Sequence, residues 1–150
     1  MMNRAPVLVT VTRNFGVSAE RVFDAWLDPA MIGHWMFGPP LREEEVLHTR
    51  IDAKIGGAFS FLVRRQGMEI DHIGNYLEID RPRRLVFTWG TAQDGASSRV
   101  IVEVTASASG CDLTLTHEMD PDWVHIKDKV AESWTKMLAS LASLATKLGA

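Results

Sequence analysis

The chain has 150 residues, of which 46% are hydrophobic and 23% are charged, and its formal net charge is −3. This length suits one domain with its own core, and the composition is that of a globular rather than a disordered protein. The acidic balance argues against a nucleic-acid-binding protein, which would carry a basic face. No stretch approaches the roughly 20 apolar residues of a membrane span. We therefore expect one cytoplasmic domain over residues 1–150.

The chain is predicted to begin with a strand and two short helices. Residues 7–15 alternate between apolar and polar side chains, which is typical of a strand. Ser18 suits the N-cap of a first helix. Asp28 and Pro29 have the chemistry of the cap and first turn of a second helix, which should end before residues 38–40.

Residues 44–119 have the pattern of successive strands separated by turn residues. The predicted strands cover residues 44–50, 58–65, 69–79, 84–91, 99–105 and 111–119. Short turns such as Gln66-Gly67 and Ser109-Gly110 join neighbouring strands, which indicates an antiparallel meander. The charged composition of residues 44–50 favours the edge of the sheet.

The segment from residue 121 to residue 148 is predicted as one helix, roughly 40 Å long. Apolar side chains recur in it at spacings of three and four, and they form one stripe: Val130, Trp134, Met137, Leu138, Leu141, Leu144 and Leu148. The meander has one apolar face, and this helix is the only element able to cover it. We therefore expect an α+β fold.

Several motifs, taken in order, resemble one family. They are Val22-Phe23-Asp24-Ala25-Trp26, Gly56-Gly57-Ala58-Phe59, the runs from Gly74 to Ile79 and from Arg81 to Trp89, Leu113-Thr114-Leu115-Thr116-His117, and then Trp134. Over roughly residues 7 to 148 the set resembles bacterial proteins similar to the activator of the ninety-kilodalton heat-shock-protein ATPase. The resemblance implies the helix-grip fold of the START-like, SRPBCC superfamily. In that fold a curved antiparallel sheet of about six to seven strands wraps a long C-terminal helix, with two short helices after the first strand.

The resemblance also implies an internal cavity between the sheet and the long helix. Its expected lining is mostly aromatic: Phe23, Trp26, Trp35, Phe37, Phe59, Phe61, Tyr76, Phe87, Trp89, His117, Trp134 and Leu138. Trp35 and Phe37 would lie near the mouth, where residues 38–40 could act as a lid. The alternative interpretation is that these side chains are simply core.

Polar groups with catalytic potential are few. His117 shares one face of the last strand with Leu113 and Leu115, so it is the best candidate for a polar group in the cavity. The alternative interpretation is that His117 is a structural histidine, hydrogen-bonded within the core or at its rim. For His72 the pattern does not settle whether its side of the strand faces inward. The acidic run at residues 43–45 is predicted to be surface charge.

We expect no metal and no cofactor, and no catalytic residue can be named. The histidines lack the spacing of a metal site, and the single cysteine excludes an internal disulfide and a cysteine-based zinc site. The sequence has no Gly-x-Ser-x-Gly motif, so it gives no support for a serine hydrolase. His48 is expected to be exposed.

Three functions remain open. The leading hypothesis is binding of a small hydrophobic or aromatic, lipid-like ligand, since burial at about 25 cal/mol per Å² gives affinity without catalytic groups. A cyclase-, aromatase- or hydrolase-like enzyme using His117 or Tyr76 would need two polar groups converging in the cavity. A protein-interaction or chaperone-regulating module would need an exposed apolar patch.

Two expectations concern protein partners. The eukaryotic co-chaperone has a separate N-terminal domain that contributes to chaperone binding, and 150 residues leave no room for one. A chaperone is therefore not the expected partner. A homodimer stays open, because the charged edge strand and exposed aromatic side chains could pair across a two-fold axis.

Overall fold

The computed structural model describes residues 5–39 and 41–149, with side chains to residue 147, so Pro40 of the expected lid and the Leu148 side chain lie outside it. The elements are β1 (Val7–Phe15), α1 (Ala19–Asp24), α2 (Pro29–Trp35), β2 (Glu45–Ile51), β3 (Ala58–Arg65), β4 (Met68–Asp80), β5 (Arg84–Thr91), β6 (Gly95–Ser107), β7 (Gly110–Met119), the 3₁₀ helix η1 (Pro121–Ile126) and α3 (Lys127–Gly149). They make the predicted α+β fold.

All seven strands of the described chain belong to one antiparallel sheet with the order β1-β7-β6-β5-β4-β3-β2. From β2 to β7 each strand pairs with the next in sequence, which confirms the meander, and β1 returns to pair with β7. His117 therefore lies in β7 opposite Val9 of β1 and Val100 of β6. The predicted edge position of residues 44–50 is also confirmed, since β2 ends the sheet.

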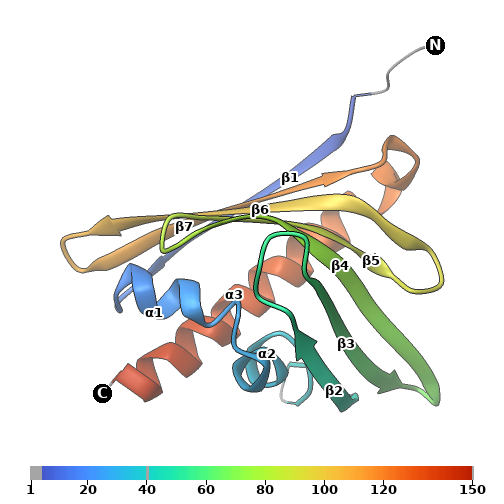
Figure 1. Cartoon of the computed structure of the whole chain (residues 1–150), viewed down its shortest axis with the longest axis horizontal. Coiled ribbons are helices and arrows are strands. Elements are labelled where there is room, and N and C mark those ends of the chain that lie inside the picture. The colour runs from blue at the N-terminus through green and yellow to red at the C-terminus, as the bar shows by residue number, and fades with distance from the viewer. Residues whose placement is uncertain (1–4, 40, 150) are drawn as a thin grey trace.

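The three α-helices lie on one side of the sheet, and α3 runs diagonally across it (Figure 1). The core forms between them. Leu113 and Leu115 of β7 and Leu138 and Leu141 of α3 are completely buried there. This is the helix-grip arrangement, in which the amphipathic helix covers the apolar face of the meander.

The two short helices begin where their caps predict. The Ser18 hydroxyl accepts a hydrogen bond from the Arg21 amide at 3.2 Å, and the Asp28 carboxylate accepts one from the Ala30 amide at 3.0 Å. Pro29 occupies the first helical position, where its missing N–H costs nothing. These caps set where α1 and α2 begin.

Two glycine-dependent features shape the middle of the sheet. Gln66 and Gly67 both have positive φ, 53° and 78°, as the tight hairpin between β3 and β4 requires. Gly74 lies inside β4, where a Cβ atom would meet the Thr88 carbonyl oxygen and, at 2.6 Å, the ring of Phe59. The missing side chain lets β5 and that ring approach β4 closely.

The C-terminal segment is not one helix. Residues Pro121–Ile126 form the 3₁₀ helix η1, and α3 starts only at Lys127. Asp120 caps the tighter turn by accepting from the Asp122 amide at 2.8 Å, a geometry that is common at helix starts. At 23 residues, α3 is about 35 Å long, shorter than predicted. Of the helices in the described ranges, none has the length and apolar character needed to cross a membrane.

Candidate functional site

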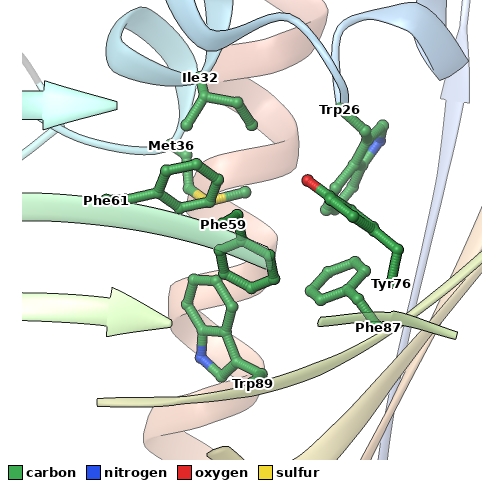
Figure 2. A pocket seen from close by; sticks show the side chains of 8 residues that line it. All are labelled: Trp26, Ile32, Met36, Phe59, Phe61, Tyr76, Phe87 and Trp89. Atoms are coloured by element: carbon green, nitrogen blue, oxygen red, sulfur yellow. The ribbon is translucent and has the colours of Figure 1, made fainter. Parts of the chain in front are cut away.

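The deepest aromatic side chains pack against one another and leave almost no space. Figure 2 shows the eight side chains around the small gap that remains, six aromatic and two aliphatic: Trp26, Phe59, Phe61, Tyr76, Phe87 and Trp89, with Ile32 and Met36. The ring of Phe59 stacks on that of Phe61 at 4.8 Å and meets that of Phe87 edge-on at 5.7 Å. The gap measures about 10 Å³, room for at most one water molecule. This region is hydrophobic core, and ligand contact by its members stays a prediction.

Three other predicted site residues also lie in the core. Phe23 and Leu138 are completely buried. Trp35 is completely buried too, its indole N–H donates to the Ala25 carbonyl at 3.0 Å, and its ring meets Trp26 edge-on at 4.7 Å. Within the described residues, none of the three lines the gap in the core or either of the larger pockets described below, and the fully buried Trp35 supports the loop from inside rather than lying at a mouth.

A larger hollow lies between the sheet and the start of α3, and it contains the remaining predicted residues. One part, about 320 Å³, is lined by Arg42, Arg65 and Lys129 together with Phe37, His72 and Trp134; we call it the arginine pocket. The other, about 240 Å³, has Asp94, Asp120 and Trp123 in its wall; we call it the aspartate pocket. Both are also lined by Trp89, His117, Ile126 and Val130, so they adjoin. We call the two together the cleft.

His117 is the centre of a hydrogen-bond chain beneath the cleft. The indole N–H of Trp134 donates to its Nδ1 at 3.1 Å. Its Nε2 lies 2.8 Å from the hydroxyl of Ser98, and that hydroxyl donates to the Trp89 carbonyl at 2.6 Å. Because an indole can only donate, Nδ1 must be the acceptor and Nε2 must carry the proton. The chain therefore fixes one neutral tautomer of the imidazole and the positions of two tryptophans.

This arrangement makes His117 a poor acid or base. Burial lowers its pKa from 6.5 to about 4, so the ring is neutral near pH 7. Both ring nitrogens are occupied, and the Ser98 proton is directed to a carbonyl rather than to the imidazole. A serine nucleophile needs the reverse arrangement, in which the histidine accepts the hydroxyl proton. The group positions side chains rather than transferring protons.

The structure answers the open question about His72, whose ring faces inward. Its Nδ1 lies 3.1 Å from the Phe61 carbonyl oxygen and so carries the proton, and the ring lies 4.7 Å from Phe37 and 5.5 Å from Trp89 between centroids. Burial lowers its pKa, which keeps it neutral at pH 7. The described residues give Nε2 no hydrogen-bond partner, so the arginine pocket has one uncharged acceptor nitrogen.

The prediction that residues 43–45 are all surface charge is wrong for Glu44. Glu43 and Glu45 are exposed, but the side chain of Glu44 is 0% exposed. One of its oxygens accepts from the Gly38 amide at 2.8 Å, and the other accepts from Nε and Nη2 of Arg65 at 3.0 and 2.6 Å. Glu44 precedes the edge strand β2 and turns inward, because the buried loop amide and the arginine provide the partners that a buried carboxylate requires.

A second histidine network lies on the other face of the sheet. His48, which was expected to be exposed, is half-buried, and its Nε2 lies 2.8 Å from the Ser60 hydroxyl. That hydroxyl donates to the Asp71 carboxylate at 2.7 Å. The serine proton therefore goes to the carboxylate and not to the histidine, which is the wrong order for a nucleophilic triad.

The sequence matches the family described as "Activator of Hsp90 ATPase homolog 1-like protein" over residues 16–146. The chain belongs to this AHSA1-like family. Similar solved structures include a protein from Nitrosomonas europaea, with 18% sequence identity and a TM-score of 0.81; the match covers 95% of this chain and 96% of that one. An AHSA1-like protein from Aeromonas hydrophila has 20% identity and a TM-score of 0.79, and the match covers 95% of this chain and 94% of that one. A protein from Rhodobacter sphaeroides has 18% identity and a TM-score of 0.82, and the match covers 94% of this chain and 93% of that one. At these identities the likeness shows the shared START-like, SRPBCC fold alone. No curated protein matches the sequence.

Sequence reasoning missed several residues of the cleft of this AHSA1-like domain. Arg65 could have been found, since it continues the alternation that places Phe59 and Phe61 on the inward face of β3. Ser98 was missed because β6 begins at Gly95, four residues earlier than predicted. The polar residues before position 99 carry no apolar alternation, although their backbone pairs with β5. No periodic signal identifies Arg42, which lies in a loop.

Proposed function

We propose that this AHSA1-like domain binds a small, largely apolar molecule in the cleft between the sheet and the first half of α3. The observation that supports this is the cleft itself, whose pockets measure about 320 and 240 Å³ and adjoin along Trp89 and His117. Ligand pockets of proteins measure roughly 300–1,000 Å³ and have mostly apolar walls with a few placed polar groups. Most of the exposed lining of the cleft is apolar, and polar and charged side chains lie at its two ends.

Burial of apolar surface is sufficient to drive binding at such a site. Trp89, Ile126 and Val130 are only half-buried in the free protein, although they belong to the wall of the cleft. Each 100 Å² of apolar surface that a ligand removes from water contributes about 2.5 kcal/mol. The neutral imidazoles of His72 and His117 add no desolvated charge to oppose this.

The enzyme alternative has less support. It requires two polar groups that converge on one substrate. Tyr76 lines the 10 Å³ gap in the core, whereas His117 lines the cleft. Burial also raises the pKa of the Tyr76 phenol well above its usual value, so it cannot act as a base near neutral pH. The two candidates therefore do not share a site.

Other expectations stay predictions. They are a cytoplasmic location, a homodimer, the absence of a cofactor and the absence of a chaperone partner. Within residues 5–39 and 41–149, no group of three or more His, Cys, Asp or Glu side chains is placed to hold a metal ion. For the protein-interaction alternative, the neighbouring residues Trp123 and Val124 of η1 are exposed, at 43% and 56%, and Leu8, Ile55, Met68 and Leu77 are exposed elsewhere. Trp123 also borders the aspartate pocket.

Native mass spectrometry of protein purified from its own host tests the proposal. We expect a small molecule in stoichiometric amount that is lost on denaturation and raises the melting temperature when added back. Ligand present at about 100 times its Kd stabilises the folded state by about 2.7 kcal/mol. An empty protein whose melting temperature is unchanged by a panel of lipids, aromatic acids and aromatic alcohols would contradict the proposal.

A further inference from the structure

We infer that the cleft selects anionic ligands, and specifically a carboxylate attached to an aromatic or aliphatic body. The acid group would bind at Arg42 and Arg65, and the apolar body would lie along Trp89 and Trp134. This inference rests on the proposed function, which it narrows from apolar molecules in general to apolar acids. It is argued from the charges of the cleft and from the hydrogen-bond donors that remain unused there.

The arginine pocket has an excess of positive charge. Arg42, Arg65 and Lys129 belong to its wall, and no carboxylate of the described residues does. The nearest acid is Glu44, which is buried beneath the two arginines and offsets one of the three charges. Because the Arg42 and Arg65 side chains are partly shielded from water, the remaining charge attracts an anion more strongly than the same charge on an open surface.

Both guanidinium groups are held in place and still have donors to spare. Arg65 uses Nε and Nη2 on Glu44, which leaves Nη1 without a partner in the described chain. Arg42 donates from Nη1 to the Met36 carbonyl at 3.4 Å, and its guanidinium carbon lies 5.9 Å from the centroid of the Phe37 ring. Their side chains are 34% and 24% exposed. Such pre-positioned groups suit a planar carboxylate, which accepts paired N–H donors.

The opposite end of the cleft carries the opposite charge. Asp94 and Asp120 line the aspartate pocket, beyond the shared residues Trp89 and His117. An acid group placed there would be repelled, so the two ends favour one orientation of the ligand. The apolar residues between the ends then contact the body of the molecule. A neutral molecule of equal size would gain the apolar contacts alone.

Titration calorimetry with matched acid and alcohol probes tests the inference. The probes are 2-naphthaleneacetate and 2-(2-naphthyl)ethanol, with decanoate and 1-decanol as an aliphatic pair. We expect each acid to bind at least tenfold more tightly than its alcohol. Arg42→Gln should weaken binding of the acids far more than binding of the alcohols, so that the preference falls to less than threefold. Arg65→Gln should do the same if it folds, but it also removes the main partner of Glu44, so Arg42→Gln is the decisive variant.

Arg64→Gln is the matched control. Arg64 is next to Arg65 in β3 but lies on the other face of the sheet, where it pairs with Glu45 and Glu69. It should keep the full preference for the acids. Equal binding of acid and alcohol would overturn the inference and leave the proposed function standing. An equal loss of preference in Arg64→Gln and Arg42→Gln would also overturn it, because the selectivity would then reflect general surface charge. If none of the four probes binds, the inference fails, and native mass spectrometry of the wild-type protein decides the proposed function separately.

Discussion

The free energy of unfolding is expected to fall by about 3 kcal/mol between pH 7 and pH 4 because of His117 alone. Burial holds the pKa of this histidine at about 4 in the folded protein, against 6.5 for a free side chain. Between these values the unfolded chain binds a proton that the folded chain does not. Each pH unit in this window changes the free energy of unfolding by about 1.4 kcal/mol. The contribution of His117 to the free energy of unfolding is therefore fully present above pH 6.5 and is lost progressively as the pH falls to 4.

Urea denaturation of His117→Gln at a series of pH values measures this effect. Glutamine can accept from the Trp134 indole and donate to Ser98, but it does not titrate. The wild-type curve should fall more steeply than the variant curve between pH 6.5 and 4, and the two should run parallel below pH 4. His34→Gln, at an exposed position in α2, should follow the wild type. Parallel wild-type and His117→Gln curves throughout would show that this histidine is not held neutral.

Glu44→Gln is expected to destabilise the folded protein by about 2–3 kcal/mol. The substitution removes the charge beneath Arg42 and Arg65 and replaces the carboxylate that accepts from the Gly38 amide. Loss of one partner of a buried ion pair is costly because the other charge stays behind. Here the two arginines are about one-quarter to one-third exposed, so water compensates them in part, and the expected loss lies below that of a fully buried pair.

Chemical denaturation at pH 7 compares Glu44→Gln with Glu43→Gln. Glu43 is the neighbouring acid and is exposed, so its substitution should change the unfolding free energy by less than about 0.5 kcal/mol. Equal effects of the two substitutions would mean that Glu44 is not held in the buried network.

Most of the fold follows from local patterns that can be read directly in the sequence. Alternation in residues 7–15, the turn at Gln66-Gly67 and the caps at Ser18 and Asp28 are local signals, and each produced the expected element. The ordered motifs added the helix-grip arrangement. The 3₁₀ turn at residues 121–126 was missed because its residues fit the start of an α-helix equally well.

The site was less predictable because it depends on how side chains fill space. Phe59 and Phe61 share an inward face with Trp89, and periodicity treats them alike. In the folded chain Phe59 stacks on Phe61 and fills the core, whereas Trp89 lies where α3 leaves the sheet partly uncovered. The acidic run at residues 43–45 poses the same problem, since only the three-dimensional position of Gly38 and Arg65 distinguishes Glu44 from its neighbours.

Filling the cleft from α3 tests the central claim most directly. Ser133 borders the arginine pocket and is half-buried, whereas Thr135, two residues further along the helix, is exposed. The measurement is native mass spectrometry of Ser133→Trp and Thr135→Trp purified alongside the wild type, with circular dichroism to confirm folding. We expect Ser133→Trp to lose the bound molecule and Thr135→Trp to retain it. A folded Ser133→Trp that keeps the molecule in wild-type amount would contradict the claim that the cleft is the binding site.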